Sequence, residues 1–240
     1  MNDVFRASLD SLAETVHEAV ADVKPKLRGW LHLGTAPLTL AAGIVLIALS
    51  PDAATRVGSA MFIGSALLLF TVSAIYHTGT WSPSTWALLR RWDHSNIFLL
   101  IAGSYTPFAL ILLQGGERTL LLTTIWGCAI LGVLFRVFWI DAPRWLYVPL
   151  YISMGWAAIF FLPGFADGAS SRLGVGTGIA VLVLVGAGGA LYTLGAVVYG
   201  FKRPNPSPQF FGFHEVFHSF TILAFVAHYV GVSLATYSLR

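Results

Sequence analysis

The chain has 240 residues, of which 56% are hydrophobic and only 10% are charged, whereas an average soluble domain carries about 25% charged residues. This composition excludes an ordinary soluble protein and predicts an integral membrane protein, built from helices that cross the roughly 30 Å hydrocarbon layer. The net charge of +3 gives no support for a nucleic-acid partner, and none is expected. The only cysteine, Cys128, lies in an apolar run, so the chain cannot form an internal disulfide.

The first 24 residues have the pattern of an amphipathic helix. Apolar side chains recur at helical spacing, while Asp10, Glu14 and Glu18 form an acidic row at intervals of four. A secretory signal peptide is not expected, because charges interrupt the apolar core that such a signal needs. The predicted domains are therefore an amphipathic N-terminal segment at 1–29, on the cytoplasmic side, and a transmembrane domain at 30–240.

Seven apolar segments long enough to cross a membrane follow. Their predicted ranges are 31–50, 58–77, 94–114, 119–139, 145–163, 175–199 and 213–236. The segment KRPNPSPQ, from Lys202 to Gln209, holds three prolines and separates the sixth span from the seventh, because proline cannot continue a helix. The predicted fold class is all-α: an integral membrane bundle of seven transmembrane helices.

The distribution of basic residues predicts the orientation of this bundle. Ten of them fall on the side of the amino terminus, and four, namely Arg56, Arg118, Arg172 and Arg240, fall on the other side. Cytoplasmic loops carry the excess of lysine and arginine in membrane proteins. The amino terminus is therefore predicted to be cytoplasmic and the carboxyl terminus outside.

Polar side chains from three spans are predicted to meet at one depth. His77 ends the second span with Ser73 one turn before it, Asp93 stands at the start of the third span, and His214 and His218 open the seventh. The end of an even-numbered span and the start of an odd-numbered one lie on the same face of the membrane. Because ionisable side chains are costly to bury in a bilayer, such a group is expected to face an internal cavity and to function there.

These residue types favour a metal centre. His214 and His218 project from one face of a helix, and His77 can supply a third nitrogen. Three imidazoles with an open fourth position are typical of catalytic zinc, which makes hydroxide available near neutral pH. Asp93 is then expected to orient a ligand or accept the proton of the water, with Ser73 hydrogen-bonding nearby. Packing or interfacial positions are predicted for the other histidines of the spans: His32, His94 and His228.

The stretch FGFHEVFH, from Phe211 to His218, also contains the HExxH pattern of zinc metalloproteases. A third protease ligand at Asp167 would lie on the opposite side of the membrane, and this excludes an intramembrane protease of that kind. Glu215 lies about 100° around the helix from His214. Its side chain is therefore expected to face a neighbouring helix or the interface instead of an ion.

Three motifs together resemble the hemolysin III family. This family is the bacterial branch of the progestin and adipoQ receptor group, which includes the adiponectin receptors and belongs to the CREST superfamily. The motifs are SAIYH (Ser73 to His77), DHSNIFLLIAGSYTP (Asp93 to Pro107) and FGFHEVFH, and the similarity extends over all seven spans. The resemblance implies a seven-helix bundle with a cytoplasmic amino terminus.

The same resemblance implies a zinc ion near the cytoplasmic face, with His77, His214 and His218 as its ligands. The family's aspartate and serine correspond to Asp93 and Ser73, which become the candidate catalytic residues. No position among these five departs from the family pattern.

The expected function follows from this resemblance as well. Relatives are thought to hydrolyse amide bonds in ceramide-like lipids, so the expectation is a lipid amide hydrolase of the bacterial inner membrane, with an acyl-chain lipid as its partner. Two alternatives stay open: a sensor of membrane lipid state with a structural zinc, and a pore-forming haemolysin. The pore is disfavoured because the ionisable residues gather at one end of the spans. The sequence predicts neither the lipid nor the oligomeric state.

Overall fold

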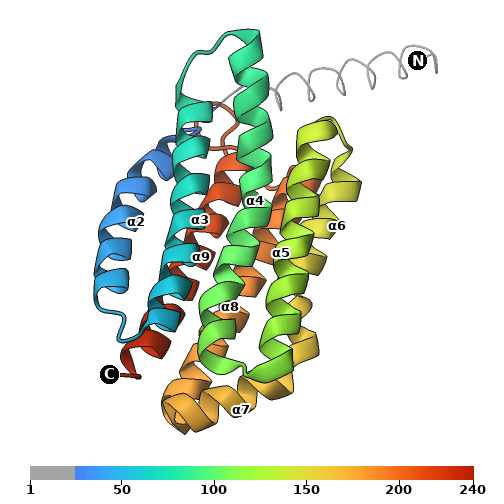
Figure 1. Cartoon of the computed structure of the whole chain (residues 1–240). Helices are drawn as coiled ribbons and strands as arrows, with labels where there is room; N and C mark the ends of the chain where they lie inside the picture. The colour runs from blue at the N-terminus through green and yellow to red at the C-terminus, as the bar shows by residue number, and fades with distance from the viewer. Residues whose placement is uncertain (1–24) are drawn as a thin grey trace, which may run out of the picture.

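The computed structural model describes residues 25–240, which form a bundle of helices without a named strand in this part of the chain (Figure 1). Within residues 25–240, seven segments are long and apolar enough to span a membrane, which confirms the predicted all-α bundle. The helices are α2 (Trp30–Ala48), α3 (Ala53–Thr78), α4 (Pro83–Leu112), α5 (Gly115–Phe138), α6 (Arg144–Gly155), η1 (Ala157–Phe161), α7 (Leu162–Leu173), α8 (Val175–Phe201) and α9 (Phe213–Tyr237). The predicted amphipathic helix falls on residues 1–24, which lie outside the described part.

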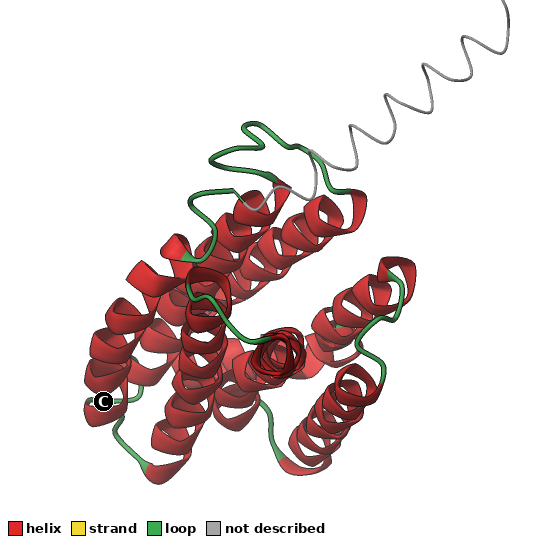
Figure 2. Ribbon diagram, turned by 90° about the horizontal axis from the view of Figure 1, so that it is seen from above, coloured by secondary structure: helices red, strands yellow, loops and turns green. Residues whose placement is uncertain are grey.

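Helix α4 is the centre of the bundle. In an apolar stretch of 18 residues in α4, 78% of the residues are buried, compared with 22% in the corresponding stretches of α2 and α8. Helix α4 also contacts α3, α5, α6, α7 and α9. Looking along the bundle, Figure 2 shows the other helices arranged around one that is seen end-on. At the crossing of α3 and α4, a Cβ added to Gly58 would lie 2.8 Å from Pro107 Cα. A small residue is needed there because the two backbones approach closely.

The start of α4 differs from the sequence-based prediction. The third span was predicted from residue 94, whereas α4 begins at Pro83, with the Ser82 hydroxyl accepting a hydrogen bond from Thr85 N (3.3 Å). Hydropathy detects only the part of a helix that lies among lipid tails, while capping by serine and proline at the first position extends the helix beyond it. Asp93 therefore lies well inside α4 and not at its start.

The fifth span is broken. It was predicted as one helix at 145–163, but it consists of α6, the short η1 and α7, and Figure 1 shows α7 lying across the lower end of the bundle. Pro163 stands in the first turn of α7, where a missing N–H costs nothing. The Tyr105 hydroxyl donates to Gly155 O (2.7 Å) and accepts from Ala158 N (2.9 Å). This side chain from α4 thus satisfies backbone groups that the break would leave unbonded.

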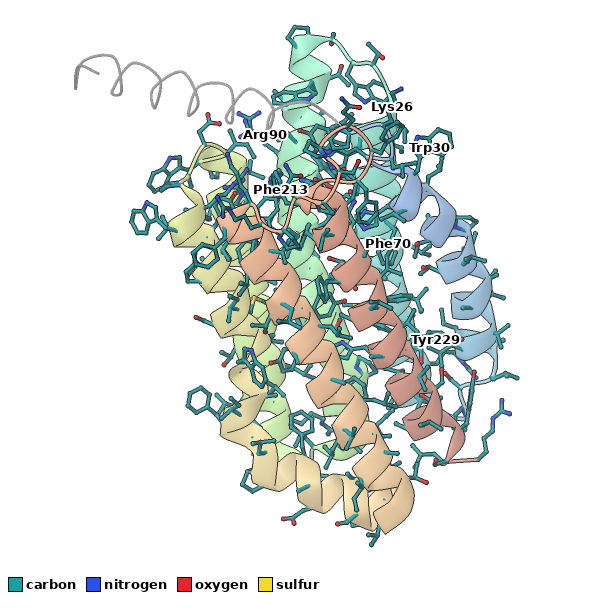
Figure 3. The ribbon with its side chains drawn as sticks, turned by 180° about the vertical axis from the view of Figure 1, so that it is seen from behind. Lys26, Trp30, Phe70, Arg90, Phe213 and Tyr229 are labelled. Carbon is teal, nitrogen blue, oxygen red and sulfur yellow. The ribbon has the colours of Figure 1, made fainter. Side chains whose placement is uncertain are left out.

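We call one end of the bundle the histidine end: there α3, α5 and α8 end and α4, α6 and α9 begin. In Figure 3, Lys26, Trp30, Arg90 and Phe213 lie toward this end, and Tyr229 lies toward the other. Most basic residues of the described chain belong to it: Lys26, Arg28, Arg90, Arg91, Arg136, Arg144, Lys202 and Arg203. It also carries exposed tryptophans, which are typical of a membrane interface: Trp30, Trp81, Trp86, Trp92, Trp139 and Trp145.

The turn before α2 is tied to the loop before α9 at the histidine end. Lys26 N donates a hydrogen bond to Gln209 O (3.0 Å). Gly29 follows with φ +89°, and a Cβ on it would lie 2.7 Å from His77 Cβ. Glycine is required here on both counts, because L residues are strained at this φ and no space remains beside His77. The chain thus passes directly over the end of α3.

Candidate metal centre

Three histidines from two helices converge inside the histidine end. Each of His77, His214 and His218 offers a ring nitrogen, and these nitrogens lie within 4.8 Å of one another. The ring centroids of His214 and His218 are 4.5 Å apart, and that of His77 is 4.8 and 5.4 Å from them. The convergence predicted from span parity is therefore present in the structure.

The donor set fits a metal ion. Nε2 of His214 and Nδ1 of His218 are buried and form no hydrogen bond within residues 25–240. A buried imidazole nitrogen without a hydrogen bond loses its solvation and gains nothing in return, unless a ligand occupies it. Three imidazoles suit zinc, which favours nitrogen and sulfur ligands. That these residues hold zinc stays a prediction.

Asp93 and Ser73 lie at the same place. Asp93 Oδ2 is 3.7 Å from Nε2 of His77, and the side chains of Ser73, Asp93, His214 and His218 all line one cavity of about 20 Å³. A volume of this size suits about one water molecule, which needs two to four polar partners. Four of the five residues that the sequence selected thus line a water-sized space, and the fifth, His77, lies beside Asp93.

Glu215 points away from this space, as expected from its position on the helix. It is fully buried and pairs with Arg28, with Oε1 2.9 Å from Arg28 Nε. Its second oxygen accepts a hydrogen bond from Gly212 N (2.7 Å), which caps the start of α9. Because both carboxylate oxygens are engaged, Glu215 holds the turn before α2 against α9 and is not available to a metal-bound water.

His32 is the residue that sequence reasoning missed. It was interpreted as a packing or interfacial residue, yet its ring stacks on His218 with centroids 3.9 Å apart, and it lines the small cavity. Its spacing in the sequence gives no signal, because it stands alone in the first span. The prediction of a packing position agrees better with His94 than with His32. In His94, Nδ1 lies 2.8 Å from Arg90 O and Nε2 lies 3.4 Å from Tyr199 Oη.

Fold and geometry together define a class of protein: a seven-helix integral membrane protein with a buried histidine cluster, from its second and seventh spans, at one end. Comparison with known proteins agrees with this class. The chain belongs to the hemolysin III family, because residues 21–229 match the family model described as Haemolysin-III related. The family resemblance inferred from the three motifs is confirmed.

Two curated relatives give the degree of similarity. The chain is 34% identical over 158 residues to the hemolysin-3 homolog of Bacillus subtilis (strain 168), a match that covers 66% of this chain and 67% of that protein. It is 35% identical over 139 residues to hemolysin-3 of Bacillus cereus, covering 58% of this chain and 59% of that protein. The chain thus matches only about three fifths of the second relative's length. These matches establish a multi-pass membrane protein of this family.

Proposed function

We propose that this chain is a zinc-dependent hydrolase of lipid amide bonds in the bacterial inner membrane, acting on a ceramide-like lipid with His77, His214 and His218 as the metal ligands. The observation that carries the proposal is the water-sized cavity shared by Asp93, Ser73, His214 and His218. Zinc, when bound, makes a coordinated water acidic enough to act as a nucleophile near pH 7. A structural metal would have no need of a carboxylate and a hydroxyl beside such a space.

Asp93 is the proton carrier in this proposal. As the water oxygen bonds to the amide carbonyl carbon, Asp93 takes a proton from the water, and Ser73 orients the water by a hydrogen bond. Asp93 then gives this proton to the amide nitrogen as the carbon–nitrogen bond breaks. The products are a fatty acid and an amine. Glu215 is excluded from this role because Arg28 and Gly212 N occupy its oxygens.

In this proposal the lipid reaches the site through a second, larger cavity of about 490 Å³ at the histidine end. His94, Tyr199 and His214 line both cavities. The apolar walls of the bundle suit the acyl chain of such a lipid. Both cavities lie at one end of the spans, which supports a site for a lipid better than a pore.

The proposal is tested with protein purified in zinc-containing buffer, by metal analysis and by measuring fatty acid released from ceramide. Wild type is expected to hold one zinc per chain and to release fatty acid. Asp93→Asn is expected to keep the zinc and lose at least about a hundredfold in rate, the usual contribution of a general base. Glu215→Gln is the matched control, expected to retain the rate per folded molecule.

The outcomes separate the alternatives. Full zinc content and full activity in His218→Ala would contradict the metal site. An unchanged rate in Asp93→Asn would remove Asp93 as the base. Zinc at one per chain with no hydrolysis of ceramide or related lipid amides would contradict the hydrolase and favour a lipid sensor with a structural metal.

A further inference from the structure

The larger cavity at the histidine end has an unusual balance of charge. Its volume is about 490 Å³, and four basic residues line it: Arg28, Arg90, Arg144 and Lys202. Among residues 25–240, the only acidic residue in its lining is Asp141, whose side chain is 76% exposed. A pocket lined by charges of one sign concentrates ligands of the opposite sign.

Two of these basic residues are already neutralised. Arg28 pairs with the buried Glu215, and Arg90 Nη1 lies 2.9 Å from Asp141 Oδ1. Arg144 and Lys202 form no ion pair with any residue in the described range 25–240. The cavity therefore keeps two positive charges that no described carboxylate balances.

Arg144 is held in a way that leaves it able to bind a ligand. Its guanidinium carbon lies 4.9 Å from the ring centroid of Tyr199 and 5.6 Å from that of Phe213. Its Nη1 is buried and has no hydrogen-bond acceptor within residues 25–240. The aromatic rings fix the plane of the guanidinium, while its N–H edge stays available. A fixed guanidinium edge matches two oxygens of a phosphate.

A further uncompensated charge lies behind the cavity wall. Arg136 is only 1% exposed, and its guanidinium carbon lies 4.3 Å from the ring centroid of Tyr147, a residue of the cavity lining. Its Nε and Nη1 have no acceptor within the described chain. Burying a cation without a partner is costly, so an anion bound nearby would be favoured by this residue as well.

We propose that this cavity binds a phosphate-type anion, from either a lipid headgroup or free phosphate, with Arg144 and Lys202 as the main contacts. Neutral or cationic ligands would leave the two charges unbalanced. The main contacts, Arg144 and Lys202, are not among the three histidines of the candidate metal centre, although His77 and His214 also line the cavity. It therefore stands or falls separately from the proposed hydrolase.

The test measures binding to the purified full chain in non-ionic detergent, by titration calorimetry. The probes are dioctanoyl phosphatidic acid, dioctanoylglycerol, which has the same acyl chains without the phosphate, and inorganic phosphate. Wild type is expected to bind the phosphatidic acid at least about tenfold more tightly than the glycerol lipid. The double variant Arg144→Gln/Lys202→Gln is expected to lose this tenfold preference, because each charge-assisted hydrogen bond contributes about that much.

The matched control is Arg118→Gln/Arg203→Gln, which removes the same charge from residues outside the cavity and is expected to keep the preference. Displacement of the phosphatidic acid by millimolar inorganic phosphate would identify free phosphate as a ligand, and no displacement would identify the lipid headgroup. Equal affinity of wild type for the two lipids, or unchanged binding in a folded double variant, would overturn the proposal. Binding that persists in His218→Ala separates this site from the metal centre.

Discussion

At the scale of single residues, the stacking of His32 on His218 leads to the first prediction. Both ring nitrogens of His32 are buried and form no hydrogen bond within residues 25–240. An apolar ring in their place removes a desolvation cost and keeps the stacking surface. We therefore expect His32→Phe to retain zinc, and His32→Ala to weaken zinc binding by about tenfold, as loss of a residue that orients a ligand does.

The measurement for this pair is competitive zinc titration against a chromophoric chelator. The melting temperature in detergent serves as the control for folding. Loss of zinc in His32→Phe as well as in His32→Ala would show that the ring acts through its nitrogens and not through its surface.

The second prediction concerns the ion pair of Arg28 and Glu215. Removing one partner leaves the other buried and uncompensated, which costs about 3–5 kcal/mol for a fully buried pair, and less here because Arg28 keeps 16% of its side chain exposed. Glu215→Leu is expected to lower the melting temperature clearly. The double variant Arg28→Leu/Glu215→Leu should recover part of this loss, as measured by thermal unfolding in detergent. Additive losses would show that the two side chains do not depend on each other.

The sequence could predict some of these residues and not others. His77, His214, His218 and Asp93 were predictable because span parity and helical spacing place them at one depth and on one face. The position of His32 depends on how α2 is rotated against α9, which a single histidine in an apolar run does not reveal. The partner of Glu215 was hidden for the same reason, because Arg28 is 187 positions away.

At the scale of helices, the break between α6 and α7 leads to the third prediction. The Tyr105 hydroxyl bonds both Gly155 O and Ala158 N, so Tyr105→Phe leaves two backbone groups without this partner. We expect a loss of about 1–3 kcal/mol, measured as a lower unfolding temperature. Tyr229→Phe is the control, because its hydroxyl donates to a single carbonyl, Ala42 O at 3.1 Å, and a smaller loss is expected. Equal shifts would contradict the role given to Tyr105.

The existence of the spans was predictable, but their ends were not. Apolar length identifies a segment that lies among lipid tails, and this gave seven segments in the correct order. It does not detect the polar first turns of α4, from Pro83 to Arg91, nor the change of direction at α7. Both features depend on capping, on proline and on a tyrosine from another helix.

At the scale of the whole molecule, the uneven distribution of basic residues leads to the fourth prediction, that the histidine end lies in the cytoplasm. Single cysteines introduced into a Cys128→Ala background report on which side of the membrane each end of the bundle lies. Ser170→Cys, in α7, is expected to react with a membrane-impermeant maleimide in intact cells. Gln209→Cys, in the loop before α9, is expected to react only in inverted vesicles. The reverse pattern would place the histidine end outside.

The tie between the turn before α2 and the loop before α9 has a consequence for how the protein is made. A ribosome delivers the first span long before the last, so Arg28 and His77 are made before their partners Glu215, His214 and His218. Nascent chains that stop short of α9 contain neither the closed ion pair nor the histidine cluster. The ion pair and the histidine cluster therefore cannot form before α9 has been made.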